Sequence, residues 1–207
     1  GQCVWNGNIV RYNFIHEGPS KGYWGRQGVY FDDLLTGNYI YGNYMVNINA
    51  GVSLHAANYN TVVNNLFFNI QGQGVLSSGG DHLGTSLENS IKRGARFKEE
   101  WENGNLLENP GAADEYYRKY AAPLIDIYKS PNANEIYEKW PFLHPDIMFG
   151  KGSFTSATGN VLKGNVLISP KSLYLSPLKD KGAYPFYKNQ GISHVAVDCI
   201  MENNHEL

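Results

Sequence analysis

An asparagine-centred repeat limits what this chain can fold into more than any other feature of the sequence. Four segments each read Asn, any residue, an apolar residue, two variable residues, Asn, and two mostly apolar residues. They are NIVRYNFI from Asn8, NYIYGNYM from Asn38, NTVVNNLF from Asn60 and NVLKGNVL from Asn160. A second register lies between them, as GVYF from Gly28, GVSL from Gly51 and GVLS from Gly74, each 23 residues after the last. Self-similarity at a fixed period is the signature of a repeat architecture.

Short β-branched runs at a period of about 22 residues, separated by Gly and Asn, predict the coils of a parallel β-solenoid. Successive coils stack at about 4.8 Å, so an Asn at the same corner of every coil can donate to one neighbour and accept from the other. Asn also tolerates the left-handed backbone that tight corners require. A leucine-rich repeat has a similar period, but it needs Leu at fixed offsets, and Leu is sparse within these segments. The prediction is therefore an all-β solenoid.

Two interruptions and the chain ends complete the predicted organisation. The first coil is lengthened by HEGPSKGYWGRQ, and a helical insertion is predicted near residues 86–142, where apolar residues follow a three-to-four spacing. Residues 176–197 are predicted to be a loop that covers the end of the stack. We expect one domain over 1–207, and a piece of a longer solenoid, because the sequence opens inside a repeat.

The second register predicts a site. If Val29, Val52 and Val75 stack and point inward, alternation along a strand places Asp32 and His55 on the same outward stripe. A carboxylate beside an imidazole on an exposed sheet face is a candidate for acid–base chemistry. Asp33 follows at the strand end. An Asp-Asp pair at such a place is also a common turn former, and this alternative stays open.

Other candidates flank that stripe. The long loop of the first coil carries Tyr23, Trp24 and Arg26, and Asp81 and His82 follow the third Gly-Val strand. Aromatic rings can stack on sugar rings, whereas carboxylates supply acid and base. Each has a structural alternative, because Trp24 can belong to the core and Arg26 can simply pair with an aspartate. Trp101 and Trp140 lie in helical segments and are predicted to be packing residues.

The composition of the chain limits the kinds of partner that we expect it to bind. Charged residues make up 17% of the chain, the formal net charge is −2, and no basic run occurs, so nucleic acid is not expected. Aromatic residues reach 14%, which suits binding of polyhydroxylated ligands.

No spacing typical of a zinc site or an EF-hand occurs, so no cofactor is predicted, and a single Ca²⁺ is left open. No apolar run approaches the roughly 18 residues of a membrane span. The two cysteines, Cys3 and Cys199, stand near opposite ends of the sequence.

The run GVYFDDLLTGNYIYGNYMVNINAGVSLHAANYNTVVNNLFFN resembles the bacterial right-handed parallel β-helix repeat proteins of the pectate-lyase-like superfamily. In that family an acidic strand, matched here by Tyr30, Asp32 and Asp33, precedes a GNxhxxN segment. The downstream YEKWPFLHPDIM and GNVLKGNVLISP resemble the part of the family that follows its insertion. The resemblance implies a right-handed β-helix that is secreted, on the cell surface or periplasmic. It also implies a place near carbohydrate-active glycoside hydrolases and polysaccharide lyases.

Three functions follow as hypotheses. The first is a monomeric glycoside hydrolase acting on a plant or host polysaccharide. Its acid and base are Asp32 with Asp33, or one of them with Asp81, and His55 tunes the acid. The residues expected to hold sugar are Tyr23, Trp24, Arg26, Tyr30 and His82. The second is a polysaccharide lyase, in which Arg26 neutralises a uronate carboxylate. The third is a non-catalytic glycan-binding or structural β-helix.

Overall fold

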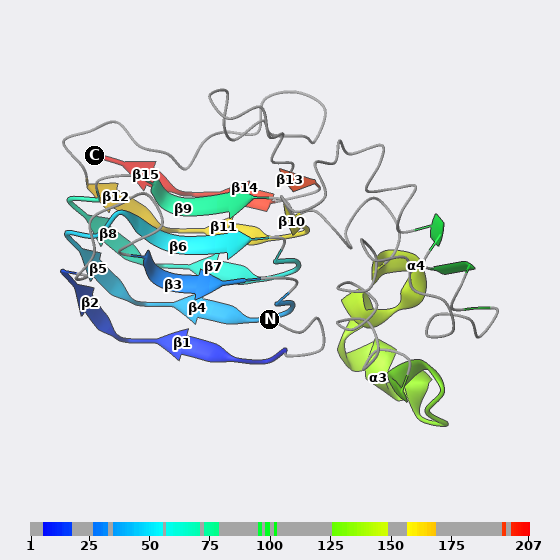
Figure 1. Ribbon diagram of the computed structural model, residues 1–207. Coiled ribbons are helices and arrows are strands. Elements are labelled where there is room, and N and C mark those ends of the chain that lie inside the picture. Colours follow the sequence, from blue (N-terminus) through cyan, green and yellow to red (C-terminus); the bar gives the residue numbers. More distant parts are fainter. Residues whose placement is uncertain are drawn as a thin grey trace.

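The structure is a computed structural model, and its strands are paired in parallel throughout (Figure 1). It describes residues 6–17, 27–32, 35–55, 57–70, 73–78, 95–96, 98–99, 102, 126–148, 157–168, 196–197 and 200–207. The first sheet is ordered β1 (Ile9–Arg11), β4 (Tyr39–Tyr41), β7 (Thr61–Val63), β11 (Val161–Lys163) and β14 (Ile200–Glu202). The second is ordered β2 (Phe14–His16), β5 (Tyr44–Val46), β8 (Leu66–Phe68), β12 (Val166–Ile168) and β15 (His205–Glu206). The third contains β3 (Gln27–Phe31), β6 (Ala50–His55) and β9 (Gln73–Ser78), and β10 (Ala157–Thr158) pairs with β13 (Ala196–Val197). The chain therefore passes from sheet to sheet and returns one strand higher, as a parallel solenoid does.

The predicted register of the third sheet is confirmed. Val29 is the pairing partner of Val52, and Val52 is the partner of Val75. The side chains of all three are buried, whereas Tyr30, the next residue along β3, is exposed. The alternation that defines the outward stripe is thus present in β3.

The asparagines form the predicted ladders. Asn43 donates from its backbone N–H and from Nδ2 to Oδ1 of Asn65, over 3.0 and 2.9 Å. Asn65 makes the same pair of bonds to Asn165, over 3.0 Å each. A second ladder joins Asn8, Asn38, Asn60 and Asn160 in the same sense. These bonds satisfy polar groups that the strand ladders leave unpaired at the coil corners.

The residue before each ladder asparagine adopts the left-handed backbone conformation. Positive φ angles are found at Gly7, Gly37, Tyr59, Gly159, Tyr12, Gly42, Asn64, Gly164 and Asn203. Such angles disfavour most side chains, which explains the frequent Gly and Asn at these corners. At Gly42 a side chain would collide with the ring of Tyr12 from the coil below, so the close stacking of corners needs glycine there as well.

The core lies between the three sheets. It consists of inward-facing side chains, the largest fully buried ones being Phe67, Ile40, Met45, Ile48, Leu54 and Ile70. Each such side chain contributes roughly 1.5–3 kcal/mol through burial. The solenoid therefore derives its stability mainly from these buried side chains.

The prediction for the C-terminal tail is wrong in part. Ala196–Val197 forms β13, and β14 and β15 add a further coil above β11 and β12. Asn204 accepts from Asn165 at the top of the ladder that contains Asn43 and Asn65. The repeat is hidden in the sequence because Cys199 stands where the first asparagine of the pattern is expected. The rest of the predicted loop lies outside the described residues.

Helices are found within the predicted insertion and extend beyond it. They are α3 (Ala133–Lys139), the 3₁₀ helix η2 (Pro141–Leu143) and α4 (Pro145–Met148), with helical residues also at 95–96, 98–99, 102 and 126–128. The ring of Phe142 stacks on Tyr59 at 5.6 Å and lies against Gly37, which docks η2 on the coil corners. Lys98 Nζ lies 2.5 Å from Oδ1 of Asp146, and this contact raises the pKa of Lys98 and lowers that of Asp146. In the part of the chain that is described, no helix has the length and apolar character needed to cross a bilayer.

Candidate functional site

The candidate site lies where β3 and β6 end. Asp32 directly follows β3, and His55 is the last residue of β6. Tyr30 and Ser53 are pairing partners in the same two strands. Because side chains two apart on a strand share a face, Tyr30 and Asp32 lie on one side of the sheet, with Ser53 and His55 beside them in the next coil.

Hydrogen bonds join three of these side chains into one cluster. Tyr30 donates from its hydroxyl to Oδ1 of Asp32 over 2.7 Å. Nδ1 of His55 lies 2.9 Å from the same oxygen. The rings of Tyr30 and His55 are 6.5 Å apart, tilted by 50°. Both bonds therefore end on Oδ1, and Oδ2 takes part in neither.

The side chains of this cluster differ in how far they are exposed to solvent. The side chain of His55 is only 7% exposed, whereas that of Asp32 is 43% exposed. When Asp32 is ionised its carboxylate can only accept, and Nδ1 of His55 then donates in this bond. In the neutral ring, Nε2 is then the basic nitrogen. The buried imidazole thus orients a carboxylate that solvent can reach.

Ser53 was not among the residues predicted from the sequence. Its side chain is buried, and its hydroxyl oxygen has no hydrogen-bond partner. Ser53, His55 and Asp32 therefore do not form a serine-hydrolase triad, which requires a bond between the serine hydroxyl and the imidazole. A small polar side chain amid larger ones gives no signal in the sequence.

The structure brings together Tyr30, Asp32 and His55, as the register predicted. The other predicted site residues lie outside the described residues: Tyr23, Trp24, Arg26, Asp33, Asp81 and His82. Their roles stay predictions.

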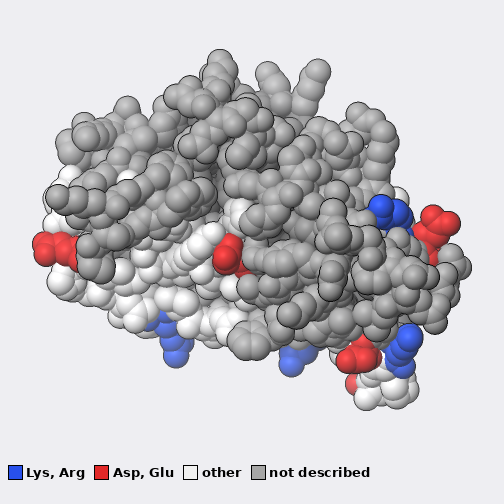
Figure 2. Space-filling model, in the orientation of Figure 1, with Lys and Arg blue, Asp and Glu red and all other residues white. Residues whose placement is uncertain are grey.

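The described residues contain no group of three or more His, Cys, Asp or Glu side chains placed to hold a metal ion. Charged side chains that are described are scattered over the face shown in Figure 2, without a cluster of one sign. The functional chemistry that the described residues offer is thus that of a single supported carboxylate.

The comparisons with known proteins add nothing to this geometry. No family model matches the chain. Neither the comparison with curated proteins nor that with solved structures gives a significant match.

Exposed aromatic side chains occur on the outer faces of the first two sheets. Phe14 stacks on His16 with ring centroids 4.8 Å apart and lies 5.4 Å from Tyr44 in the next coil. Arg11 donates to the hydroxyl of Tyr41 over 2.7 Å, and this bond raises the pKa of Arg11. These contacts stabilise neighbouring coils on the outside, as cross-strand pairs do in other sheets.

Proposed function

We propose that the chain is a carbohydrate-active enzyme that hydrolyses glycosidic bonds of a polysaccharide, with Asp32 as one of its two catalytic carboxylates. Asp33 or Asp81 supplies the second. The observation that carries this proposal is the support of one carboxylate oxygen by both Tyr30 and His55 while the side chain stays half exposed.

Glycoside hydrolysis requires a carboxylate whose orientation is fixed, as that of Asp32 is. Glycoside hydrolysis uses a pair of carboxyl groups held at a fixed separation, one protonating the leaving oxygen and the other activating water or attacking the sugar. Two donors on Oδ1 fix the plane of the carboxylate, which leaves Oδ2 to meet the substrate. Fixing a reacting group in this way lowers the entropic cost of reaching the transition state.

Tyr30 has a second use in the proposal. Its side chain is 41% exposed, and its hydroxyl is tied to Asp32. A ring held at that position can pack against the apolar face of a sugar next to the cleavage point. Tyr30 then both orients the acid and positions the substrate.

The finer description of the fold belongs to the same proposal. We infer a right-handed β-helix of the pectate-lyase-like type, since parallel strands joined by crossovers are right-handed in about 98% of cases. The stacked parallel sheets and the asparagine ladders support it. A secreted monomer that acts on a polymer agrees with the low share of charged residues and the high share of aromatic ones.

The test uses the full chain with polygalacturonan, xylan and arabinogalactan as separate substrates. New reducing ends without an unsaturated product that absorbs in the near ultraviolet are expected from at least one of them. Asp32→Asn is expected to lower this release by about 10²–10⁴-fold. The absence of release from all three polymers, or equal release by Asp32→Asn, contradicts the proposal. An unsaturated product assigns the chain to the lyases instead.

A further inference from the structure

A cavity of about 430 Å³ lies between α3 with η2 and the segment that leads into the first coil. Its apolar lining comes from Ile127, Ile136, Leu143 and Trp140. The volume falls in the range of about 300–1,000 Å³ that is typical of small-molecule sites. No residue of the Tyr30, Asp32 and His55 cluster lines it.

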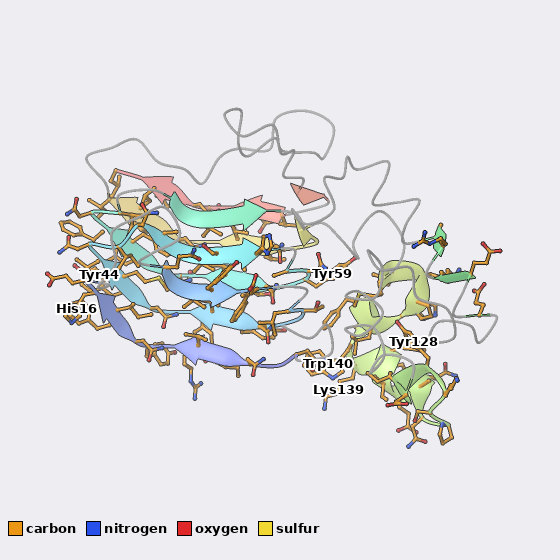
Figure 3. All side chains as sticks on the ribbon, viewed as in Figure 1. His16, Tyr44, Tyr59, Tyr128, Lys139 and Trp140 are labelled. Atoms are coloured by element: carbon orange, nitrogen blue, oxygen red, sulfur yellow. The ribbon has the colours of Figure 1, made fainter. Side chains whose placement is uncertain are left out.

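Trp140 forms a wall whose position is fixed by its neighbours. Its ring packs at the corner of the first coil, where a Cβ on Gly7 would be 3.6 Å from the indole. The ring of Phe142 meets it edge-on at 5.9 Å. Figure 3 shows Trp140 and Lys139 next to each other, where the end of α3 approaches the coil stack. Nζ of Lys139 lies over this ring, 5.9 Å from its centroid, so the indole and the ammonium border the same part of the cavity.

The polar lining comes from both sides of the cavity. Asn6 contributes from the coil segment, and Glu135 and Lys139 contribute from successive turns of α3. Glu135 and Lys139 carry opposite charges one turn apart on α3, and both line the cavity, so each can bond to a hydroxylated ligand. Together they add no net charge, and an amide adds one more donor and acceptor.

We propose that this cavity binds a single pyranose unit of a neutral sugar. The C–H face of the ring packs on Trp140 and the isoleucines, and its hydroxyls bond to Asn6, Glu135 and Lys139. A neutral polyhydroxylated ligand fits, because the wall is aromatic and the charges of the rim cancel. Binding here goes beyond the proposed hydrolysis and does not depend on Asp32.

The experiment titrates the full chain separately with D-galactose, D-glucose and L-fucose, followed by saturation-transfer NMR. At least one sugar is expected to bind with a roughly millimolar dissociation constant, since a small ligand in an open cavity gains few contacts. Glu135→Ala and Lys139→Ala are each expected to weaken binding about tenfold, the loss of a hydrogen bond to a charged group. Glu138→Ala, an exposed residue of the same helix outside the lining, serves as the matched control and is expected to bind like the unmodified chain.

The outcomes separate this site from the catalytic one. Asp32→Asn is expected to lose hydrolysis and to keep monosaccharide binding. Failure of all three sugars to saturate, or unchanged binding by both Glu135→Ala and Lys139→Ala, overturns the proposal. So does binding that disappears in Asp32→Asn and persists in Glu135→Ala, because the sugar then occupies the cluster at Asp32. Tighter binding of L-leucine than of any of the sugars overturns it as well, since the opposite charges then select a zwitterion.

Discussion

Nδ1 of His55 lies 2.9 Å from Oδ1 of Asp32, although 23 residues separate them in the chain. One coil of the solenoid spans this separation, so the two residues end neighbouring strands and meet side by side. His55 is buried while Asp32 is half exposed, and the pair therefore has one supporting and one accessible member.

The first prediction concerns this carboxylate. Asp32→Asn keeps the size of the side chain and removes its charge and basicity, so hydrolysis is expected to fall by about 10²–10⁴-fold, the usual contribution of an acid–base group. The measurement is the release of reducing ends from the polymer that the unmodified chain cleaves best. Glu202→Gln changes an exposed acid on β14, which pairs with Lys163, and is expected to keep full activity. Similar losses in both variants would mean that general destabilisation, and not chemistry, lowers the rate.

The second prediction separates the two roles of Tyr30. Tyr30→Phe keeps the ring but removes the donor to Asp32, so the turnover rate is expected to drop about tenfold while KM changes little. Tyr30→Ala removes the ring as well and is expected to raise KM. Steady-state kinetics on one polymer distinguish the two. A rise of KM in Tyr30→Phe that equals the rise in Tyr30→Ala would contradict the assignment of stacking to the ring.

Much of the fold can be predicted from the sequence because each coil repeats the same physical requirement. Asn43 and Asn65 recur since every corner has polar groups that only the next coil can satisfy. The last coil was not predicted, because Cys199 replaces one asparagine of the pattern and residues 169–199 separate β14 from β12 in the sequence. A sequence pattern does not identify a coil whose residues differ from those of the other coils.

The candidate site could be predicted only in part. The strand register places His55 beside Asp32, because equivalent positions of successive repeats pair in a parallel sheet. The buried hydroxyl of Ser53 and the cavity at Trp140 could not be predicted in the same way. They depend on side-chain directions and on how the helices pack against the coils, and neither can be inferred from a local sequence pattern.

The third prediction concerns the ladders. Asn65 is buried and bonded to Asn43, Asn165 and the carbonyl of Ile40. Asn65→Ala leaves several of these groups unpaired, so the free energy of unfolding is expected to fall by about 3 kcal/mol or more, at roughly 1–3 kcal/mol for each buried group. Asn13→Ala removes an exposed asparagine at the end of the same ladder and is expected to cost about 1 kcal/mol. Urea denaturation measures both, and equal losses would show that position within the ladder does not matter.

The fourth prediction tests the docking of η2 on the coil corners. Gly37 and Gly7 both have left-handed backbones, with φ of 68° and 73°. A Cβ on Gly37 would collide with the ring of Phe142, whereas a Cβ on Gly7 would meet Trp140 only at ordinary contact distance. Both alanine variants carry the backbone cost of about 1–2 kcal/mol, so the comparison isolates the steric cost of displacing Phe142. Gly37→Ala is therefore expected to destabilise the chain more than Gly7→Ala and to increase hydrogen exchange in residues 141–148, while exchange in β4 and β7 stays slow. Restored stability in Gly37→Ala/Phe142→Ala relative to Gly37→Ala is expected if the ring is the cause. Equal effects of the two single glycine variants on stability and exchange would contradict this contact.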